Sequence, residues 1–241
     1  MQSQHIVSAY DDELKFLARK IAAMGGQAER MVDQAIAALV NADPALGQRV
    51  IQDDIVLDEA QREIDDKAIL IIARRQPMAT DLREIVGAIR ISADLERVGD
   101  LGKNIAKRVL AVAEGRQPNS LFRGLEALAE LALTQLKEVL DVYASRSVER
   151  IGFVRDRDEQ IDAMYTSLFR ELLTYMMEDP RNITPCTHLL FVAKNIELIG
   201  DHATNIAETI YYIVTGDQMP PERPKEDKSH HITLEGEGKP G

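Results

Sequence analysis

The sequence predicts an all-α protein made of two tandem three-helix bundles with an elongated shape. Three observations support this fold class. Apolar residues recur every three or four positions, as on one face of a helix, and not every two as in a strand. Short breaks with proline, glycine or serine divide the chain into six long segments. One short segment occurs twice, once in each half, which indicates a duplicated architecture.

The duplicated segment spans residues 95–106 and again residues 196–207. Glu, Gly, Asp, Asn, Ile and Ala recur in both copies in the same order and at the same spacing. The match lies in helical sequence and includes a carboxylate pair of the form Glu-x-x-x-Asp. It therefore predicts two halves with equivalent helices and defines a set of acidic side chains to test as ligands.

The breaks between segments predict where each helix begins and ends. Asp43 followed by proline suggests an N-cap with proline at the first helical position, and Gln76 followed by proline ends a helix. Gly216 fits a C-cap, and Gly25 with Gly26 offers a place for a kink in the first helix. The expected helices are 7–42, 44–75, 78–114, 119–145, 147–178 and 184–215.

The expected organisation follows from these helices. Residues 1–115 form the first three-helix unit and residues 119–216 the second, joined by a short linker. Short connections make successive helices antiparallel, and a helix of about 30 residues is about 45 Å long. Residues 217–241 contain prolines, glycines and charges without an apolar period, so we expect a disordered acidic tail.

Composition excludes several classes of protein. A net charge of −11 argues against a nucleic-acid binder, which needs a basic face. No run approaches 18 apolar residues, and no secretory signal pattern opens the chain. Cys186 is the single cysteine, which excludes an internal disulfide and a cysteine-based zinc cage and predicts a small buried residue. We find no plausible Ser/His/Asp or Cys/His nucleophile set, and cytoplasmic residence is the simplest expectation.

Eight carboxylates form the candidate site residues. Each copy of the repeat carries one pair four residues apart, and a second pair precedes it on the preceding helix. Four residues is one helical turn, so both acids of a pair share a face. The first set is Asp54, Asp58, Glu96 and Asp100, and the second is Asp158, Asp162, Glu197 and Asp201.

These acids continue an apolar stripe, so their like charges need compensation by a metal, by Lys or Arg partners, or by raised pKa values. Oxygen-only ligand sets favour hard cations over thiolate-loving metals. The alternative is that the acids face water and pair with Lys103, Lys107 or Lys194. His188 and His202 are either extra ligands of the second set or ordinary hydrogen-bonded histidines. Residue chemistry alone leaves both readings open.

The chain resembles the PhoU family of phosphate transport accessory proteins over its length to about residue 216. The paired Glu/Asp-x-x-x-Asp motifs are the metal-binding signature of that family. Leu198 is a departure, because the family usually has arginine there, although no proposed ligand is lost. The segments that carry the resemblance are Met24-Gly25-Gly26, Arg75-Gln76-Pro77, Asp81-Leu82-Arg83, and residues 95–100, 174–179 and 196–201.

The resemblance implies a non-enzymatic, cytoplasmic negative regulator of phosphate uptake that contains two three-helix bundles and is often a homodimer. It implies contacts with a phosphate-sensing histidine kinase and with the ATP-binding subunit of the phosphate ABC transporter, and membrane proximity only through these partners. Divalent or iron cations (Mg, Mn, Zn or Fe) at the carboxylates are expected, with no organic cofactor and no nucleic acid. The alternative is a carboxylate-bridged metal-dependent enzyme or metal-storage protein, which the lack of a Glu-x-x-His motif in either repeat copy disfavours.

Overall fold

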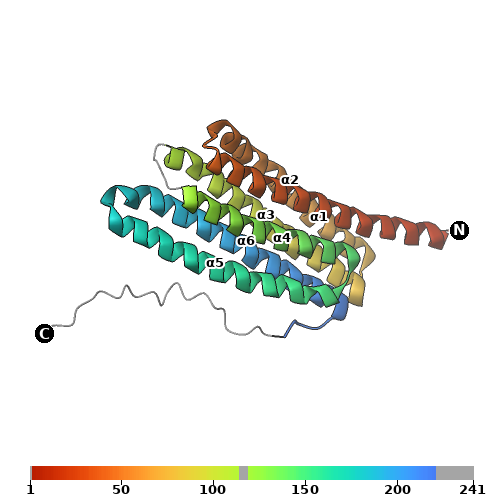
Figure 1. The fold of residues 1–241 in the computed structure, drawn as a ribbon. Coiled ribbons are helices and arrows are strands. Elements are labelled where there is room, and N and C mark those ends of the chain that lie inside the picture. The colour runs from red at the N-terminus through yellow and green to blue at the C-terminus, as the bar shows by residue number, and fades with distance from the viewer. Residues whose placement is uncertain (1, 114–118, 221–241) are drawn as a thin grey trace.

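The computed structural model describes residues 2–113 and 119–220, which fold into six helices (Figure 1). No strand occurs within these two ranges, so the all-α prediction is confirmed. Turns of 3-10 helix at Val148–Arg150 and Pro180–Asn182 lead into the last two helices. The helices are α1 Gln2–Val40, α2 Pro44–Arg75, α3 Ala79–Ala113, α4 Asn119–Ser145, α5 Ile151–Glu178 and α6 Ile183–Thr215.

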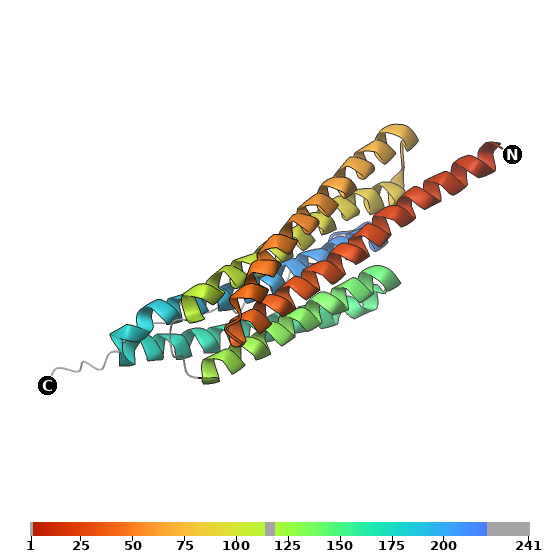
Figure 2. The same ribbon diagram turned by 90° about the horizontal axis from the view of Figure 1, so that it is seen from above.

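The two three-helix bundles lie side by side along their lengths. Helices α1, α2 and α3 contact one another, as do α4, α5 and α6. The bundles meet through α3 against α6 and α1 against α4. The result is an elongated molecule in which the N-terminal end of α1 projects beyond the other helices (Figure 2). The predicted pair of bundles is confirmed, and α3 and α6 occupy its centre.

The core repeats with the helices. Buried Leu17 and Ile21 of α1 have counterparts in buried Leu121 and Leu125 of α4, 104 positions later. The same spacing relates α2 to α5, whereas α3 and α6 match at a spacing of 101, as the duplicated segment shows. The chain between the second and third helices is therefore three residues shorter in the second half.

Local chemistry explains several helix ends. The Asp43 side chain accepts a hydrogen bond from the backbone N–H of Leu46 at 3.0 Å, and Pro44 opens α2, as predicted. Gly216 caps α6 with φ of 83°, also as predicted. Two expected starts were wrong: α1 begins at Gln2 and not at 7, and α5 begins at Ile151 because a 3-10 turn occupies the preceding residues.

Two predicted irregular segments fall wholly or partly outside the described residues: the linker at 114–118 and the tail from 221 onward. The disorder expected in the tail stays a prediction, as do the limits of the two units. The first residues of the tail are described, and Met219 packs against the hydrophobic core, partly buried. The beginning of the tail is therefore docked on the bundle.

Glycines mark close approaches between helices. Helix α1 continues without interruption through Gly25, where an added Cβ would lie 2.6 Å from Leu140 of α4. That glycine admits the neighbouring helix and does not interrupt α1. Gly99 of the repeat likewise faces Leu57 of α2, whose buried side chain occupies the space a Cβ would need.

Candidate functional site: two acidic clusters

The first acidic cluster, Asp54, Asp58, Glu96 and Asp100, lies where α2 packs against α3. Asp54 is buried, whereas Glu96 and Asp100 are half-buried. The ammonium of Lys103, one turn along α3, lies 2.5 Å from Asp54 Oδ2 and 2.5 Å from Asp100 Oδ1. The lysine therefore joins acids from both helices.

Charge compensation in this cluster comes from α3 itself. Arg97 Nη1 lies 3.3 Å from Asp100 Oδ2, and Arg97 Nε lies 3.7 Å from Glu96 Oε2. Burial alone would favour the neutral amine, but hydrogen bonds to Asp100 and Asp54 outweigh it and raise the pKa of Lys103 above its usual range. Burial, followed by the charge of Asp100, raises the pKa of Glu96 above its ordinary value, and Arg97 offsets this only partly.

The second acidic cluster, Asp158, Asp162, Glu197 and Asp201, lies where α5 packs against α6. It is the more deeply buried of the two, because Asp158, Asp162 and Glu197 are 7%, 4% and 3% exposed. Lys194 Nζ lies 2.6 Å from Glu197 Oε2 and 5.3 Å from the centre of the Tyr165 ring. The structure thus brings acids of both sets together with lysines, one of the three kinds of compensation expected.

Gln135 of α4 belongs to the second cluster and was missed in the sequence. It is fully buried, and its side-chain amide donates to Val154 O at 3.0 Å and to Thr204 Oγ1 at 3.1 Å. The same nitrogen lies 3.4 Å from Asp158 Oδ1. The amide oxygen has no hydrogen-bond partner among the described residues. Its sequence signal was a glutamine placed on the apolar stripe of α4.

The metal assignment of the eight acids stays a prediction. Within the described ranges, no three His, Cys, Asp or Glu side chains converge closely enough to hold a metal as they stand. Like-charged carboxylates repel one another, so only a bound cation would hold them close together. The donor set, carboxylate and amide oxygens, fits a hard cation. The orphaned, buried oxygen of Gln135 fits the same chemistry.

The two histidines considered as extra ligands have other partners. His202 Nδ1 lies 2.9 Å from Asp94 Oδ1 of α3, and His188 Nδ1 lies 3.2 Å from Arg108 Nη1 of α3. Both contacts join the two bundles, which matches the hydrogen-bonded alternative. Cys186 is fully buried, as predicted.

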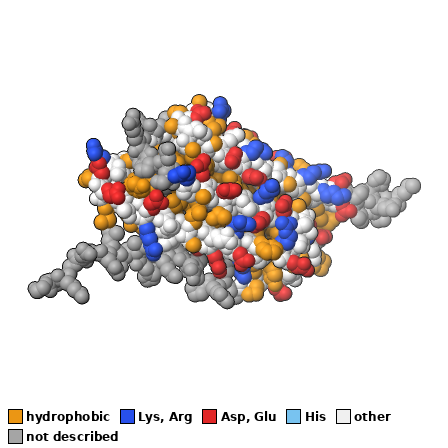
Figure 3. All heavy atoms as spheres, in the orientation of Figure 1, with side chains coloured by type: hydrophobic (Ala, Val, Ile, Leu, Met, Phe, Trp, Pro, Cys, Tyr) orange, Lys and Arg blue, Asp and Glu red, His pale blue; other side chains and the backbone are white. Residues whose placement is uncertain are grey.

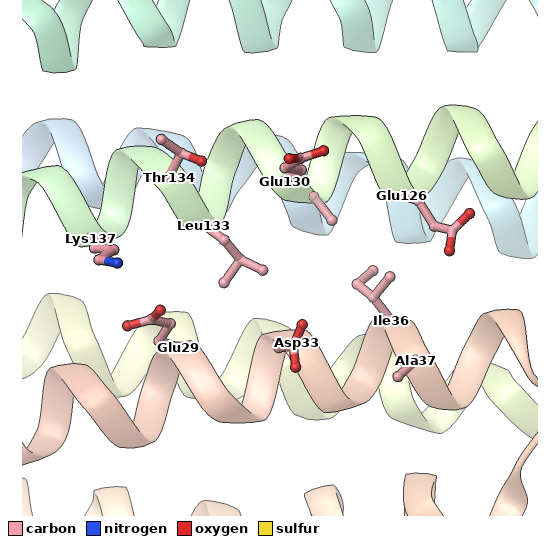
Figure 4. Close-up of a pocket in the computed structure, with 10 residues that line it drawn as sticks. Glu29, Asp33, Ile36, Ala37, Glu126, Glu130, Leu133, Thr134 and Lys137 are labelled. Atoms are coloured by element: carbon pink, nitrogen blue, oxygen red, sulfur yellow. The ribbon is translucent and has the colours of Figure 1, made fainter.

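A groove between α1 and α4 was not predicted. Its volume is about 340 Å³. Glu29 and Asp33 of α1 face Leu133 and Lys137 of α4 across it (Figure 4). Glu126 and Glu130 add two further acids to the α4 side. The groove depends on which helices meet across the bundle interface, so neither helix indicates it alone.

No helix within the described ranges has the length and apolar character that a membrane span requires.

Comparison with known proteins shows which family shares this architecture. The family model described as PhoU domain matches residues 21–109 and again 125–210, one match per bundle. A protein of Rhizobium meliloti named phosphate-specific transport system accessory protein PhoU homolog is 71% identical over 227 residues, 94% of this chain and 96% of that protein. A Caulobacter vibrioides protein of the same name is 49% identical over 225 residues, 93% of this chain and 98% of that protein.

Solved structures agree with the sequence comparisons. The crystal structure of PhoU from Pseudomonas aeruginosa matches with a TM-score of 0.81 at 36% identity and covers 86% of this chain and 100% of that one. The phosphate transport system regulatory protein PhoU from Streptococcus pneumoniae gives a TM-score of 0.81 at 26% identity, covering 88% of this chain and 100% of that one. With both bundles matched and both repeat copies in place, the chain belongs to the PhoU family.

Proposed function

We propose that this protein is a negative regulator of phosphate uptake and of the phosphate-starvation response. In this proposal it is a non-catalytic adaptor between the phosphate ABC transporter and a phosphate-sensing histidine kinase. The observation that carries the proposal is the 71% identity, over 94% of the chain, to a relative named as an accessory protein of phosphate-specific transport. A non-catalytic accessory protein acts through docking surfaces, and exposed apolar side chains are candidates for such surfaces.

Some of the exposed apolar side chains lie at the two hairpins that join the second and third helix of each bundle, and others, such as Ile55 and Phe153, lie elsewhere on the helices. Met78 is 81% exposed beside the α2–α3 connection, and Met177 is 67% exposed at the end of α5. These hairpins lie at opposite ends of the molecule (Figures 1 and 2). On the face drawn in Figure 3, hydrophobic side chains are interspersed with charges of both signs. An adaptor needs separate contact regions for two proteins, and two apolar ends are compatible with that need.

The partners we propose are the sensor kinase and the ATP-binding subunit of the transporter, met in the cytoplasm at the inner face of the membrane. The protein itself acts as a homodimer and reaches the membrane only through these contacts. We propose further that the two acidic clusters bind divalent or iron cations, which would neutralise the carboxylates on their facing helices.

A phosphate-responsive reporter tests the regulatory role. Deleting the gene should switch the reporter on in phosphate-rich medium, and restoring the full chain should silence it again. Tagged protein from the same cells should retain the kinase and the ATP-binding subunit. A reporter that stays silent after the deletion contradicts the proposal, as does purified protein that shifts promoter DNA at physiological salt. Oxidase or phosphatase activity in metal-loaded protein would instead support the enzyme alternative.

A further inference from the structure

The groove between α1 and α4 has a counterpart that is filled. The spacing of 104 between these helices matches Ile36 to Leu140 and Gly25 to Ala129. At the counterpart, Leu140 packs so closely on Gly25 that an added Cβ would lie 2.6 Å from it. At the groove, Ile36 and Ala129 instead border a hollow of about 340 Å³. The duplication therefore gives two equivalent places between the helices, and side chains fill one and leave the other open.

Unpaired acids border the open place. Glu138 of α4, close by in sequence, shows the usual arrangement, because it pairs with Arg157 on the neighbouring helix. The four acids of the groove have no ion-pair or hydrogen-bond partner among the described residues. The charged side chains along the groove and its continuation are the acids Glu29, Asp33, Glu126 and Glu130 and the cations Lys137 and Arg30.

The acids of α4 are not a property that both halves share. The positions of α1 that match Glu126 and Glu130 hold Ala22 and Gly26. The counterpart therefore lacks these two carboxylates, and the excess of negative charge belongs to the open place alone. An open groove and a surplus of acids occur together in one half of a duplicated interface.

The groove has an apolar floor between polar rims. Ile36 and Ala129 are only 7% and 2% exposed, and Leu133 is half-buried and points into the space between the helices (Figure 4). Asp33 and Glu130 are exposed, one on each rim. An apolar strip flanked by charge is the surface that receives the apolar face of an amphipathic helix.

The size of the groove fits a short helical segment. Its walls extend about 12 Å along α1 and about 16 Å along α4, at about 1.5 Å per residue, which is two to three helical turns. A cavity of about 150 Å³ holds one benzene molecule, so a hollow of about 340 Å³ has room for a few aliphatic side chains. Because the rims stand in water, the groove suits a protein segment better than an enclosed small molecule.

We propose that the groove between α1 and α4 docks a basic amphipathic helix of a partner protein. Aliphatic side chains of that helix cover Ile36, Ala129 and Leu133, and its lysines or arginines meet the four acids. The inference rests on the proposed adaptor role and gives one of its contacts a location. A second copy of this chain is a poor occupant, because its net charge is −11. An anionic membrane surface is repelled by the same acids.

Fluorescence anisotropy with a labelled model peptide tests the proposal. The probe is an amphipathic helix of alanine, lysine and leucine, about 18 residues long, with leucine at every third or fourth position. At physiological salt the full-length protein should bind this peptide and should not bind a version with glutamate in place of lysine. A version with serine in place of leucine keeps the charge and should bind about tenfold more weakly. A wild type that binds no basic peptide, or that binds the glutamate version equally well, overturns the proposal.

Neutralising three acids separates the groove from the general charge of the protein. The triple variant Asp33→Asn, Glu126→Gln and Glu130→Gln should weaken peptide binding about tenfold or more. The matched control is Glu59→Gln, Asp66→Asn and Glu159→Gln, which changes three exposed acids of α2 and α5 and alters the net charge equally. That control should shift binding less than about twofold. Equal weakening in both variants would show non-specific attraction to an acidic protein and overturn the proposal.

Leu133→Gln tests the apolar floor. It should weaken peptide binding about tenfold, because an aliphatic side chain of the peptide loses its contact. Leu70→Gln is the matched control, since Leu70 is already 45% exposed on α2, and should bind as the wild type does. Unchanged binding in a folded Leu133→Gln variant overturns the apolar contact. Circular dichroism checks the fold, and the triple variant, which changes exposed side chains only, decides the question if Leu133→Gln unfolds.

The phosphate reporter separates this inference from the proposed function. The wild type and the control triple variant should silence the reporter, and the groove triple variant should not. A groove variant that silences as well as the wild type leaves the regulatory role in place and overturns the part of the groove in it. A wild type that fails to silence overturns the regulatory role, while peptide binding still decides whether the groove docks a basic helix.

Discussion

His202 of α6 and Asp94 of α3 contact each other between the two bundles, with 2.9 Å between Nδ1 and Oδ1. Both side chains are mostly shielded from solvent, with exposed fractions of 24% and 18%. Replacing Asp94 with Asn or His202 with Gln should lower the free energy of unfolding by about 1 kcal/mol. Urea denaturation measures each loss. In a double-mutant cycle the two losses should not add, and full additivity would show that the contact contributes nothing.

Gly99→Ala should destabilise the first bundle. The new methyl group would overlap Leu57, which is buried and has little room to turn. Overpacking of this kind costs about 1–3 kcal/mol, which thermal and urea unfolding would detect. Gly152→Ala is the control, because nothing lies within 4 Å of its added Cβ. That variant should be neutral or more stable by up to about 1 kcal/mol. Equal losses in both variants would rule out the packing argument.

Glu13→Gln should destabilise the protein in a pH-dependent way. Burial raises the pKa of Glu13, but hydrogen bonds from Arg75 and Lys67, at 3.0 and 3.2 Å, outweigh burial. They hold the pKa below its ordinary value of 4.5. A depressed carboxylate pKa adds stability above the unfolded pKa and loses it as the pH falls through the folded pKa. The variant should therefore lose about 1 kcal/mol at pH 7 and less below about pH 4. Glu59→Gln, exposed on α2, should show no such trend.

The double variant Asp100→Asn with Asp201→Asn should bind less metal than the wild type and keep its fold. Each change leaves a neutral amide of nearly the same shape, so helix packing is retained, although Asp100→Asn also weakens the ion pairs with Lys103 and Arg97. Elemental analysis after loading with excess Mn²⁺ gives the metal content, and circular dichroism checks the helices. Asp66→Asn with Asp156→Asn changes two exposed acids and serves as the control. Metal content equal to that of a metal-binding wild type would contradict the assignment of these acids.

Removing the tail should leave regulation intact. Residues 217–241 have no apolar period with which to dock on a partner. A chain that ends after Pro220 should silence the phosphate reporter as well as the full chain does. A chain that ends after Gly216 also loses Met219 from the core surface and the 2.8 Å bond from Arg155 to Pro220 O, at a cost of about 1 kcal/mol. Loss of silencing in the first truncation would assign the tail a regulatory role.

The sequence predicted those features that local chemistry controls. Helix α2 was placed correctly because Asp43 and Pro44 form a cap readable from a few neighbouring residues. The start of α5 was missed because Ser147 gives no side-chain cap and a 3-10 turn follows it. The start of α1 was missed because no stop signal precedes it.

The same distinction between local sequence and long-range packing applies to the candidate site. Four of the acids could be identified because they lie in the repeat, and the other four because they form matching pairs on the preceding helices. The lysines named as possible partners lie on α3 and α6. The burial of Gln135 could not be foreseen, because it depends on how α4 meets α5 and α6. Which lysine bridges which helix, as Lys103 bridges α2 and α3, also depends on packing between residues far apart in sequence.

The antiparallel pairing of α3 with α6 gives the molecule an internal dyad. Residue numbers rise on one helix as they fall on the other, from Asp94 beside His202 to Arg108 beside His188. A perfect duplication would give the molecule two identical faces, and any partner protein would find two equivalent binding sites. Divergence at matched positions, such as Lys103 and Thr204, removes that equivalence. The two bundles therefore differ at matched positions, and a protein that distinguishes one bundle from the other can bind the molecule in a single orientation.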